Sequence, residues 1–131
     1  MKTKACIATD VIREIERRTL NYFMDFCSIV KLKELSDDVS GYDVIKYLQL
    51  KYHFLPSSGT VYSCLYNLER KGMLKGRQNG RKRLYALTQY GAETAQSIIE
   101  GKDRIINFVS MILQKNGSLT FRNFPQSLFH T

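Results

Sequence analysis

The stretch SSGTVYSCLYNLERKGML, residues 57–74, has the pattern of an amphipathic helix. At a helical repeat of about 100° per residue, one side gathers the apolar residues Val61, Cys64, Leu65 and Leu68. The opposite side carries Gly59, Ser63, Tyr66, Asn67 and Arg70, with Thr60 and Tyr62 at its flanks. A helix that only filled a core would not need this polar side. We therefore expect a helix over about residues 57–71 that packs on a core with one side and meets a partner with the other.

Turn-forming residues mark both ends of this helix. Pro56 breaks the chain before it, either Ser57 or Ser58 can cap its N-terminus, and Gly72 provides a C-terminal stop. The three cysteines of the chain are an odd number without CxxC spacing, so neither a disulfide framework nor a zinc site is expected. Cys64, beside the apolar side of the helix, is interpreted as a small buried hydrophobic residue.

A basic β-hairpin is predicted to follow the helix, over residues 73–87. The segments 73–78 and 81–87 flank Asn79-Gly80, which is the strongest short-range signal for a two-residue type I′ turn. Seven basic residues and no acidic one occur from position 70 to position 83, namely Arg70, Lys71, Lys75, Arg77, Arg81, Lys82 and Arg83. A tight turn holds such charges close together, where they suit a phosphate backbone or a narrow minor groove.

Three further helices are predicted from apolar residues at helical spacing. The first covers about residues 10–33 and is followed by a loop over residues 35–40. Ser40, with an acidic residue three positions on, resembles a capping box that opens a short helix over residues 41–52. The last helix is long and covers about residues 89–115, after which residues 116–131 form a C-terminal tail with several large apolar residues.

The long helix over residues 89–115 has a wider apolar stripe than a small domain needs. Nine positions share one side, and eight of the nine are apolar: Ala95, Ile98, Ile99, Lys102, Ile105, Ile106, Val109, Ile112 and Leu113. We predict a homodimer in which this helix packs against the same helix of a second copy and the first helix joins in. The alternative is that the helix only packs back on its own domain. Lys102, beside Gly101, interrupts the stripe and predicts a crossing point or a kink.

Composition restricts the class of protein. The 131 residues, 44% of them hydrophobic, can form one domain with a core, and the net charge of +8 suits a polyanionic partner such as nucleic acid. There is no run of about 18 apolar residues and no signal-peptide pattern, so we expect a soluble cytoplasmic protein without a membrane segment. No glycine-rich phosphate loop, metal-ligand spacing or nucleophile motif is present. We therefore expect no enzyme activity, cofactor or metal.

The order helix, helix, helix, basic hairpin is that of a winged helix-turn-helix, and three segments resemble the PadR-like transcriptional regulators. They are SGYDVIKYL (40–48), the stretch 57–74, and RKRLYALTQYGAE (81–93). The family pattern falls on Gly41, Tyr42, Thr60, Tyr62, Leu65, Leu68, Glu69, Gly72, Tyr85, Leu87, Thr88 and Gly91. The resemblance covers roughly residues 10–115. It implies a mainly α fold with a small β-hairpin, a winged helix-turn-helix over residues 1–88, followed by a long C-terminal dimerisation helix over residues 89–115.

Independently of the family, the polar side of the helix over residues 57–71 is suited to DNA. A helix fits into the major groove, where asparagine and arginine can contact base edges in bidentate fashion. The hydroxyls and unpaired N–H groups at the start of the helix suit a phosphate. The predicted DNA-binding residues are Ser57, Ser58, Thr60, Tyr62, Ser63, Tyr66, Asn67, Arg70, Lys71, Arg77, Arg81, Lys82 and Arg83.

Three functional hypotheses remain open. The leading one is a sequence-specific, homodimeric transcriptional regulator, and specifically a repressor, that binds double-stranded DNA in the nucleoid. The others are an architectural DNA-binding protein of low sequence specificity and a winged-helix protein-interaction module. The resemblance also implies that a small-molecule effector could bind near the dimer interface. Phe23, Phe26 and Phe108 could line such a site, although filling a core is the commoner role of phenylalanine.

Overall fold

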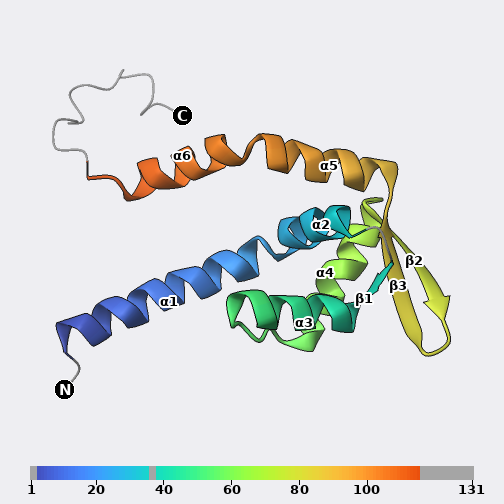
Figure 1. Ribbon diagram of the computed structural model, residues 1–131, viewed down its shortest axis with the longest axis horizontal. Helices are drawn as coiled ribbons and strands as arrows, with labels where there is room; N and C mark the ends of the chain where they lie inside the picture. Colours follow the sequence, from blue (N-terminus) through green and yellow to red (C-terminus); the bar gives the residue numbers. More distant parts are fainter. Residues whose placement is uncertain (1–2, 36–37, 116–131) are drawn as a thin grey trace, which may run out of the picture. The chain divides into compact units, whose positions relative to one another are not determined.

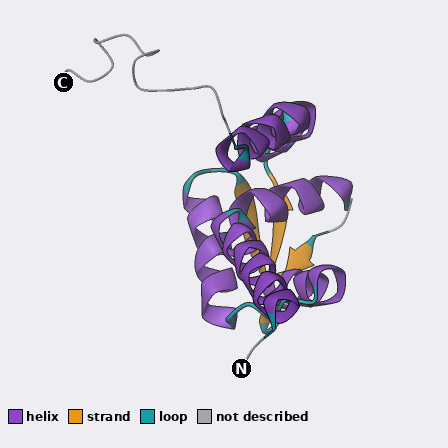
Figure 2. Ribbon diagram, turned by 90° about the vertical axis from the view of Figure 1, so that its left-hand side faces the viewer, coloured by secondary structure: helices purple, strands orange, loops and turns teal. Residues whose placement is uncertain are grey.

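The computed structural model describes residues 3–35 and 38–115 of the chain. Helices make up most of the described residues, and the strands lie in one small sheet (Figures 1 and 2). The elements in chain order are α1 (Lys4–Tyr22), α2 (Met24–Glu34), β1 (Val39–Ser40), α3 (Gly41–Tyr52), α4 (Ser58–Arg70), β2 (Leu74–Asn79), β3 (Lys82–Leu87), α5 (Gln89–Glu100) and α6 (Lys102–Leu113). They belong to two compact units, one that ends at Glu100 and one that begins at Gly101.

The helices α3 and α4 begin where local capping places them. Ser40 and Asp43 form a reciprocal capping box at the start of α3, because each side chain accepts a hydrogen bond from the backbone N–H of the other. Ser57 caps α4 by accepting a hydrogen bond from the backbone N–H of Thr60. After α4 the chain turns at Gly72, whose φ of +80° is a conformation that favours glycine. The observed bounds of α4 lie one residue inside the predicted 57–71 at each end.

The helix predicted over residues 10–33 is two helices, which corrects the prediction. The backbone leaves helical geometry at Phe23, with φ −98° and ψ 15°, and α2 starts at the next residue. Helix α2 buries Met24, Ser28, Ile29 and Leu32, whereas no residue of α1 is buried and its Leu20 packs only partly against the core. The periodicity of the sequence could not reveal this, because apolar spacing continues across a break of one residue.

The three strands form an antiparallel sheet in the order β1-β3-β2. The segment 35–40 was predicted as a loop, but Val39 and Ser40 pair with Tyr85 and Leu84 as strand β1. Asn79 pairs with Lys82, so the two turn residues are Gly80-Arg81 rather than the predicted Asn79-Gly80. The φ of Gly80 is +63° and neither neighbour has a positive φ, as in a II′ turn and unlike the predicted type I′.

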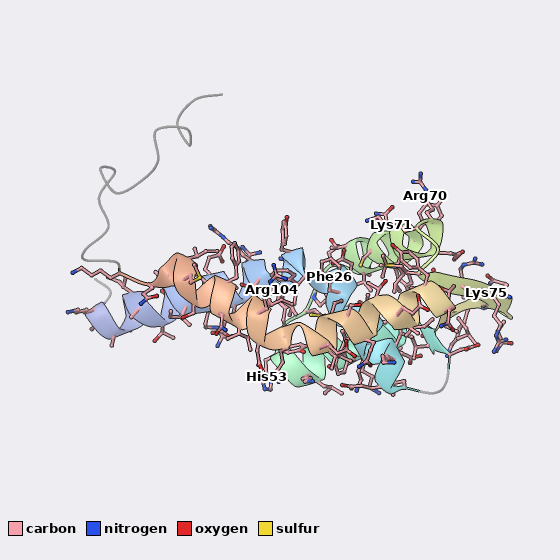
Figure 3. The ribbon with its side chains drawn as sticks, turned by 90° about the horizontal axis from the view of Figure 1, so that it is seen from above. Phe26, His53, Arg70, Lys71, Lys75 and Arg104 are labelled. Atoms are coloured by element: carbon pink, nitrogen blue, oxygen red, sulfur yellow. The ribbon has the colours of Figure 1, made fainter. Side chains whose placement is uncertain are left out.

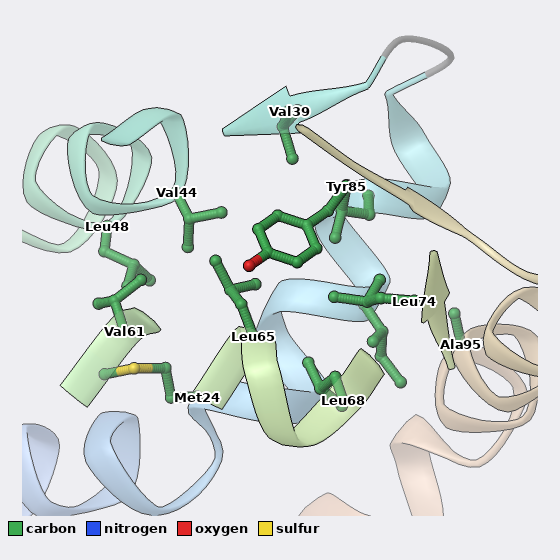
Figure 4. Close-up of a cluster of buried hydrophobic side chains, with 12 residues drawn as sticks. Met24, Val39, Val44, Leu48, Val61, Leu65, Leu68, Leu74, Tyr85 and Ala95 are labelled. Carbon is green, nitrogen blue, oxygen red and sulfur yellow. The ribbon is translucent and has the colours of Figure 1, made fainter. Parts of the chain in front are cut away.

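The core lies between α2, α3, α4, α5 and the sheet. Leu65 and Ile29 are fully buried, and the ring of Tyr85 points from β3 into the cluster beside Val44 and Leu65 (Figure 4). Ala95 of α5 is also fully buried in this cluster. These side chains come from segments spread over most of the unit, so the core ties the hairpin to the helices.

Helix α5 is anchored directly to the end of the hairpin. Thr88 donates a hydrogen bond to the Gly72 carbonyl at 2.5 Å and accepts one from the N–H of Gly91 at 3.1 Å. A Cβ at Gly91 would collide with the carbonyl group of Met73, so this close approach requires glycine. These contacts join α5 to the hairpin within the unit that ends at Glu100.

The long helix predicted over residues 89–115 is also divided. Gly101 separates α5 from α6, with φ −88° and ψ 6°, at the place where the sequence predicted a crossing point or a kink. Helix α6 contains no buried residue, whereas α5 buries Gly91 and Ala95. The two halves of the predicted helix thus have different environments.

We predict that Leu65→Ala lowers the free energy of unfolding by about 2–5 kcal/mol, because it removes a fully buried side chain from the centre of the core. The matched control is Tyr66→Ala, on the exposed side of the same helix, which should change stability by about 0.5 kcal/mol or less. Urea unfolding followed by circular dichroism measures both. Equal losses would contradict the orientation of α4.

Candidate nucleic-acid interface

The polar side of α4 faces solvent. Ser63, Tyr66, Asn67 and Arg70 are all exposed, and Tyr66 retains 59% of its accessible surface. The Arg70 guanidinium lies 5.8 Å from the centroid of the Tyr66 ring, and Figure 3 shows Arg70 projecting from the end of α4 beside Lys71. The side-chain amide of Asn67 makes no hydrogen bond to any other described residue. These side chains can therefore contact a partner without breaking internal bonds.

The predicted residues at the start of α4 have different environments. The Ser57 hydroxyl oxygen accepts hydrogen bonds from the N–H and from the hydroxyl of Thr60, both at 3.3 Å. Ser57 therefore holds the start of the helix, whereas Ser58 is exposed beside it. The exposed N-terminus, with its unpaired N–H groups and the partial positive charge of the helix dipole, remains suited to an anion.

Tyr62 is held by α3. Its ring lies so close to Gly41 that a Cβ there would come within 2.8 Å of Cδ1 and 2.9 Å of Cζ. The tyrosine nevertheless keeps 48% of its surface exposed. Gly41 therefore allows the start of α3 to approach α4 closely, and the contact fixes the orientation of a side chain at the edge of the candidate interface.

Only some of the basic residues of the hairpin have unpaired charges. The Arg83 guanidinium forms a bidentate ion pair with the Glu69 carboxylate, with Nη2 2.6 Å from Oε2 and Nε 3.2 Å from Oε1. This pair raises the pKa of Arg83. Arg77 pairs through Nε with the Asp38 carboxylate at 2.7 Å. Arg81 and Lys82, at the tip, are exposed and form no ion pair within the described part of the chain.

The local sequence pattern reveals neither acidic partner. Glu69 stands just outside the basic run that begins at Arg70, and it was recognised only as part of a family pattern. Asp38 is separated from Arg77 by 39 positions, so no local pattern connects them. The basic run suggested a uniformly positive hairpin, whereas in the structure Arg77 and Arg83 are paired and Lys75, Arg81 and Lys82 form no ion pair within the described residues.

The residues predicted for the dimer interface also divide into two groups. Ala95 is fully buried in the core of its own chain, so, unlike the prediction, it leaves no surface for contact with a second copy. Its small side chain lets α5 pack closely, and Ile98 is partly buried against the same core. The remaining predicted residues are exposed: Ile99, Lys102, Ile105, Ile106, Val109, Ile112 and Leu113. An apolar row on α1 is exposed as well, formed by Ile7, Val11, Ile12 and Ile15.

The Cys27 and Cys64 thiols are half-buried. Burial raises the pKa of the Cys64 thiol to about 11 and also raises that of Cys27, so both stay protonated at neutral pH. Within residues 3–35 and 38–115, no group of His, Cys, Asp and Glu side chains could hold a metal ion. No helix in these ranges is long and apolar enough to span a membrane.

The sequence matches the model of one known protein family. The model of the Transcriptional regulator PadR-like family matches residues 31–97, just over half of the chain. No curated protein matches the sequence.

Solved structures share the fold at low sequence identity. A PadR family transcriptional regulator from Eggerthella lenta is 18% identical with a TM-score of 0.66, over 84% of this chain and 98% of that one. A PadR-like transcriptional regulator from Bacillus cereus is 20% identical with a TM-score of 0.59, over 76% and 99%. The Staphylococcus aureus MepR–DNA complex is 19% identical with a TM-score of 0.57, over 88% of both chains.

We predict that Ser57→Ala destabilises the protein by about 0.5–2 kcal/mol, because it leaves N–H groups at the start of α4 without their cap. Ser58→Ala removes the neighbouring exposed hydroxyl, which caps nothing, and should change stability by about 0.5 kcal/mol or less. Thermal unfolding of the two variants without DNA provides the comparison. If Ser58→Ala is the more costly change, Ser58 rather than Ser57 is the cap.

Proposed function

The chain belongs to the PadR-like family of transcriptional regulators, and we propose that it is a homodimeric repressor that binds double-stranded DNA in a sequence-specific manner. The observation that carries this proposal is the exposed polar side of α4, together with a hairpin tip whose Arg81 and Lys82 form no ion pair with any described residue. Ser63, Asn67 and Arg70 would read base edges in the major groove. Arg81 and Lys82 would contact the phosphate backbone beside it.

A second copy of the chain is the partner that best suits the exposed apolar surface of α6. Ile105, Val109 and Ile112 follow one another at coiled-coil spacing, and all are exposed in the single chain. Around a twofold axis, the same stripe on both copies would cover itself. The exposed apolar row of α1 is another surface that a second copy would cover. A dimer would also present two recognition helices to successive turns of the major groove, so it would favour a palindromic site.

Repression and effector binding are further parts of the proposal. A dimer seated on a promoter would exclude other proteins from the same DNA in the cytoplasm. The ring centroids of Phe23 and Phe26 are 6.2 Å apart, and Phe26 is exposed. We propose that such aromatic side chains would contact an aromatic or cationic effector.

Two other functions give different experimental signatures. An architectural protein would use the net charge of +8 for affinity without discriminating between DNA sequences. A protein-interaction module would show little salt-dependent affinity for any duplex. The exposed hydrogen-bonding groups of Ser63 and Asn67 favour sequence-specific binding over both, because contact with charge alone does not need them.

We predict that Ile105→Glu converts the homodimer to monomers and abolishes binding to a selected DNA site. A carboxylate without a partner in the interface would cost about 3–5 kcal/mol. Light scattering measures the mass, and Asn107→Glu, on the opposite side of α6, is the matched control that should remain dimeric. A mass of one chain for the wild-type protein at micromolar concentration would contradict the dimer.

We predict that Asn67→Ala weakens binding to the selected site by about 1–3 kcal/mol and hardly changes binding to random DNA, because the amide would read a base. Removing Arg81 and Lys82 together should weaken binding to both DNAs and reduce the salt slope by about one per lost phosphate contact. Competition binding at several salt concentrations distinguishes the two patterns.

The same titrations test the alternatives. Equal losses on both DNAs for the Asn67 variant and the tip variant would favour an architectural protein. A wild-type affinity that hardly changes between low and high salt would favour a protein-interaction module, because phosphate contacts release counterions.

A further inference from the structure

One ion pair connects the recognition helix α4 to the hairpin. Glu69 lies in the last turn of α4, and Arg83 lies in β3, 14 positions later. The Arg83 Nη2 is 2.6 Å from Oε2 and 2.9 Å from Oε1 of Glu69. The guanidinium also lies 5.9 Å from the centroid of the Tyr85 ring, on the side of the hairpin that faces the core. Arg83 is therefore oriented toward α4.

Gly76 provides the space for this pair. It stands in β2 opposite Tyr85, so its missing side chain would point to the same face as Arg83. A Cβ at Gly76 would collide with Glu69 Oε1 and come within 2.7 Å of both Nε and Nη2 of Arg83. The carboxylate and the guanidinium thus lie across β2 where any other residue would displace them.

Stability alone does not account for this arrangement. The side chains of Arg83 and Glu69 are 43% and 24% exposed, and ion pairs with such access to water contribute little to folding. The other ion pair of the hairpin, between Arg77 and Asp38, attaches it to the segment before β1 and not to α4. The Glu69–Arg83 pair is the charged link between the two elements that the proposed function brings to DNA.

We infer that Glu69 is a positioning residue for DNA recognition. By holding Arg83, it fixes the hairpin against α4, so that base contacts from α4 and phosphate contacts from the tip form together. A hairpin that moved independently would lose more freedom on binding, and affinity for the specific site would fall. Arg83 then acts through Glu69 rather than as a DNA contact of its own. This inference rests on the proposed function.

Three variants distinguish the effect of the Glu69–Arg83 ion pair from the effect of the net charge. Glu69→Gln removes the link and one negative charge. Gly76→Ala displaces the link and leaves every charge in place. Asp38→Asn removes one negative charge and the partner of Arg77, but leaves the link to α4 intact, and is therefore the matched control for Glu69→Gln.

The link can be tested without DNA by nuclear magnetic resonance. In the wild-type protein and in Asp38→Asn, the Arg83 Nε–H proton should exchange with solvent more slowly than that of the exposed Arg81. The protection should be lost in Glu69→Gln and in Gly76→Ala. Equal exchange of Arg81 and Arg83 in the wild-type protein would overturn the inference.

Competition binding then tests the role in recognition. Affinity for the selected site should fall about tenfold in Glu69→Gln and Gly76→Ala, and change by about twofold or less in Asp38→Asn. On random DNA, Glu69→Gln and Asp38→Asn should bind more tightly through their added net charge, and Gly76→Ala should match the wild type.

Two results on the selected site would overturn the inference: wild-type affinity in both Glu69→Gln and Gly76→Ala, or an equal loss in Asp38→Asn. If the wild-type protein binds no duplex, the proposed function fails and the recognition role fails with it. The Arg83 exchange measurement would still show whether the link exists.

Discussion

Burial of one side of α4 is the constraint on which the rest of the structure depends. Val61, Leu65 and Leu68 occupy the space between α2, α3 and the sheet. Almost none of the surface of these three side chains is accessible to solvent. Since the same helix carries polar residues on its other side, removing the apolar side from water forces those residues outward. Folding energy and the presentation of the candidate DNA contacts therefore come from one orientation of one helix.

Two single-residue breaks determine which apolar surface the core uses. Phe23 divides the first helical region and Gly101 the last, and in each case the half nearer to α4 in sequence contributes buried residues. The outer halves, α1 and α6, keep apolar side chains exposed. This division gives the proposed dimer its own surface without weakening the core of the protomer. Ala95 illustrates the difference, because its position in the stripe suggested an interface whereas its burial assigns it to the core.

Charge in the hairpin is distributed by the fold and not by composition. Four basic residues surround the turn, but the acidic side chains of Asp38 and Glu69 neutralise two of them. Arg81 and Lys82, at the tip, are exposed and form no ion pair with any described residue. The paired arginines instead hold the hairpin in place, which links its shape to the presentation of α4.

Local sequence alone determined α3, α4 and the hairpin, since a capping box, an apolar stripe and a glycine turn each act within a few residues. The exposure of Ser63, Asn67 and Arg70 followed from the same stripe. The interrupted stripe at Gly101 and Lys102 also predicted a kink there. Only the tertiary structure decided the strand β1, the burial of Ala95, the break at Phe23 and the two ion pairs of the hairpin. Each depends on groups far apart in the chain or on which of two equally apolar surfaces meets the core, and local periodicity contains neither kind of information.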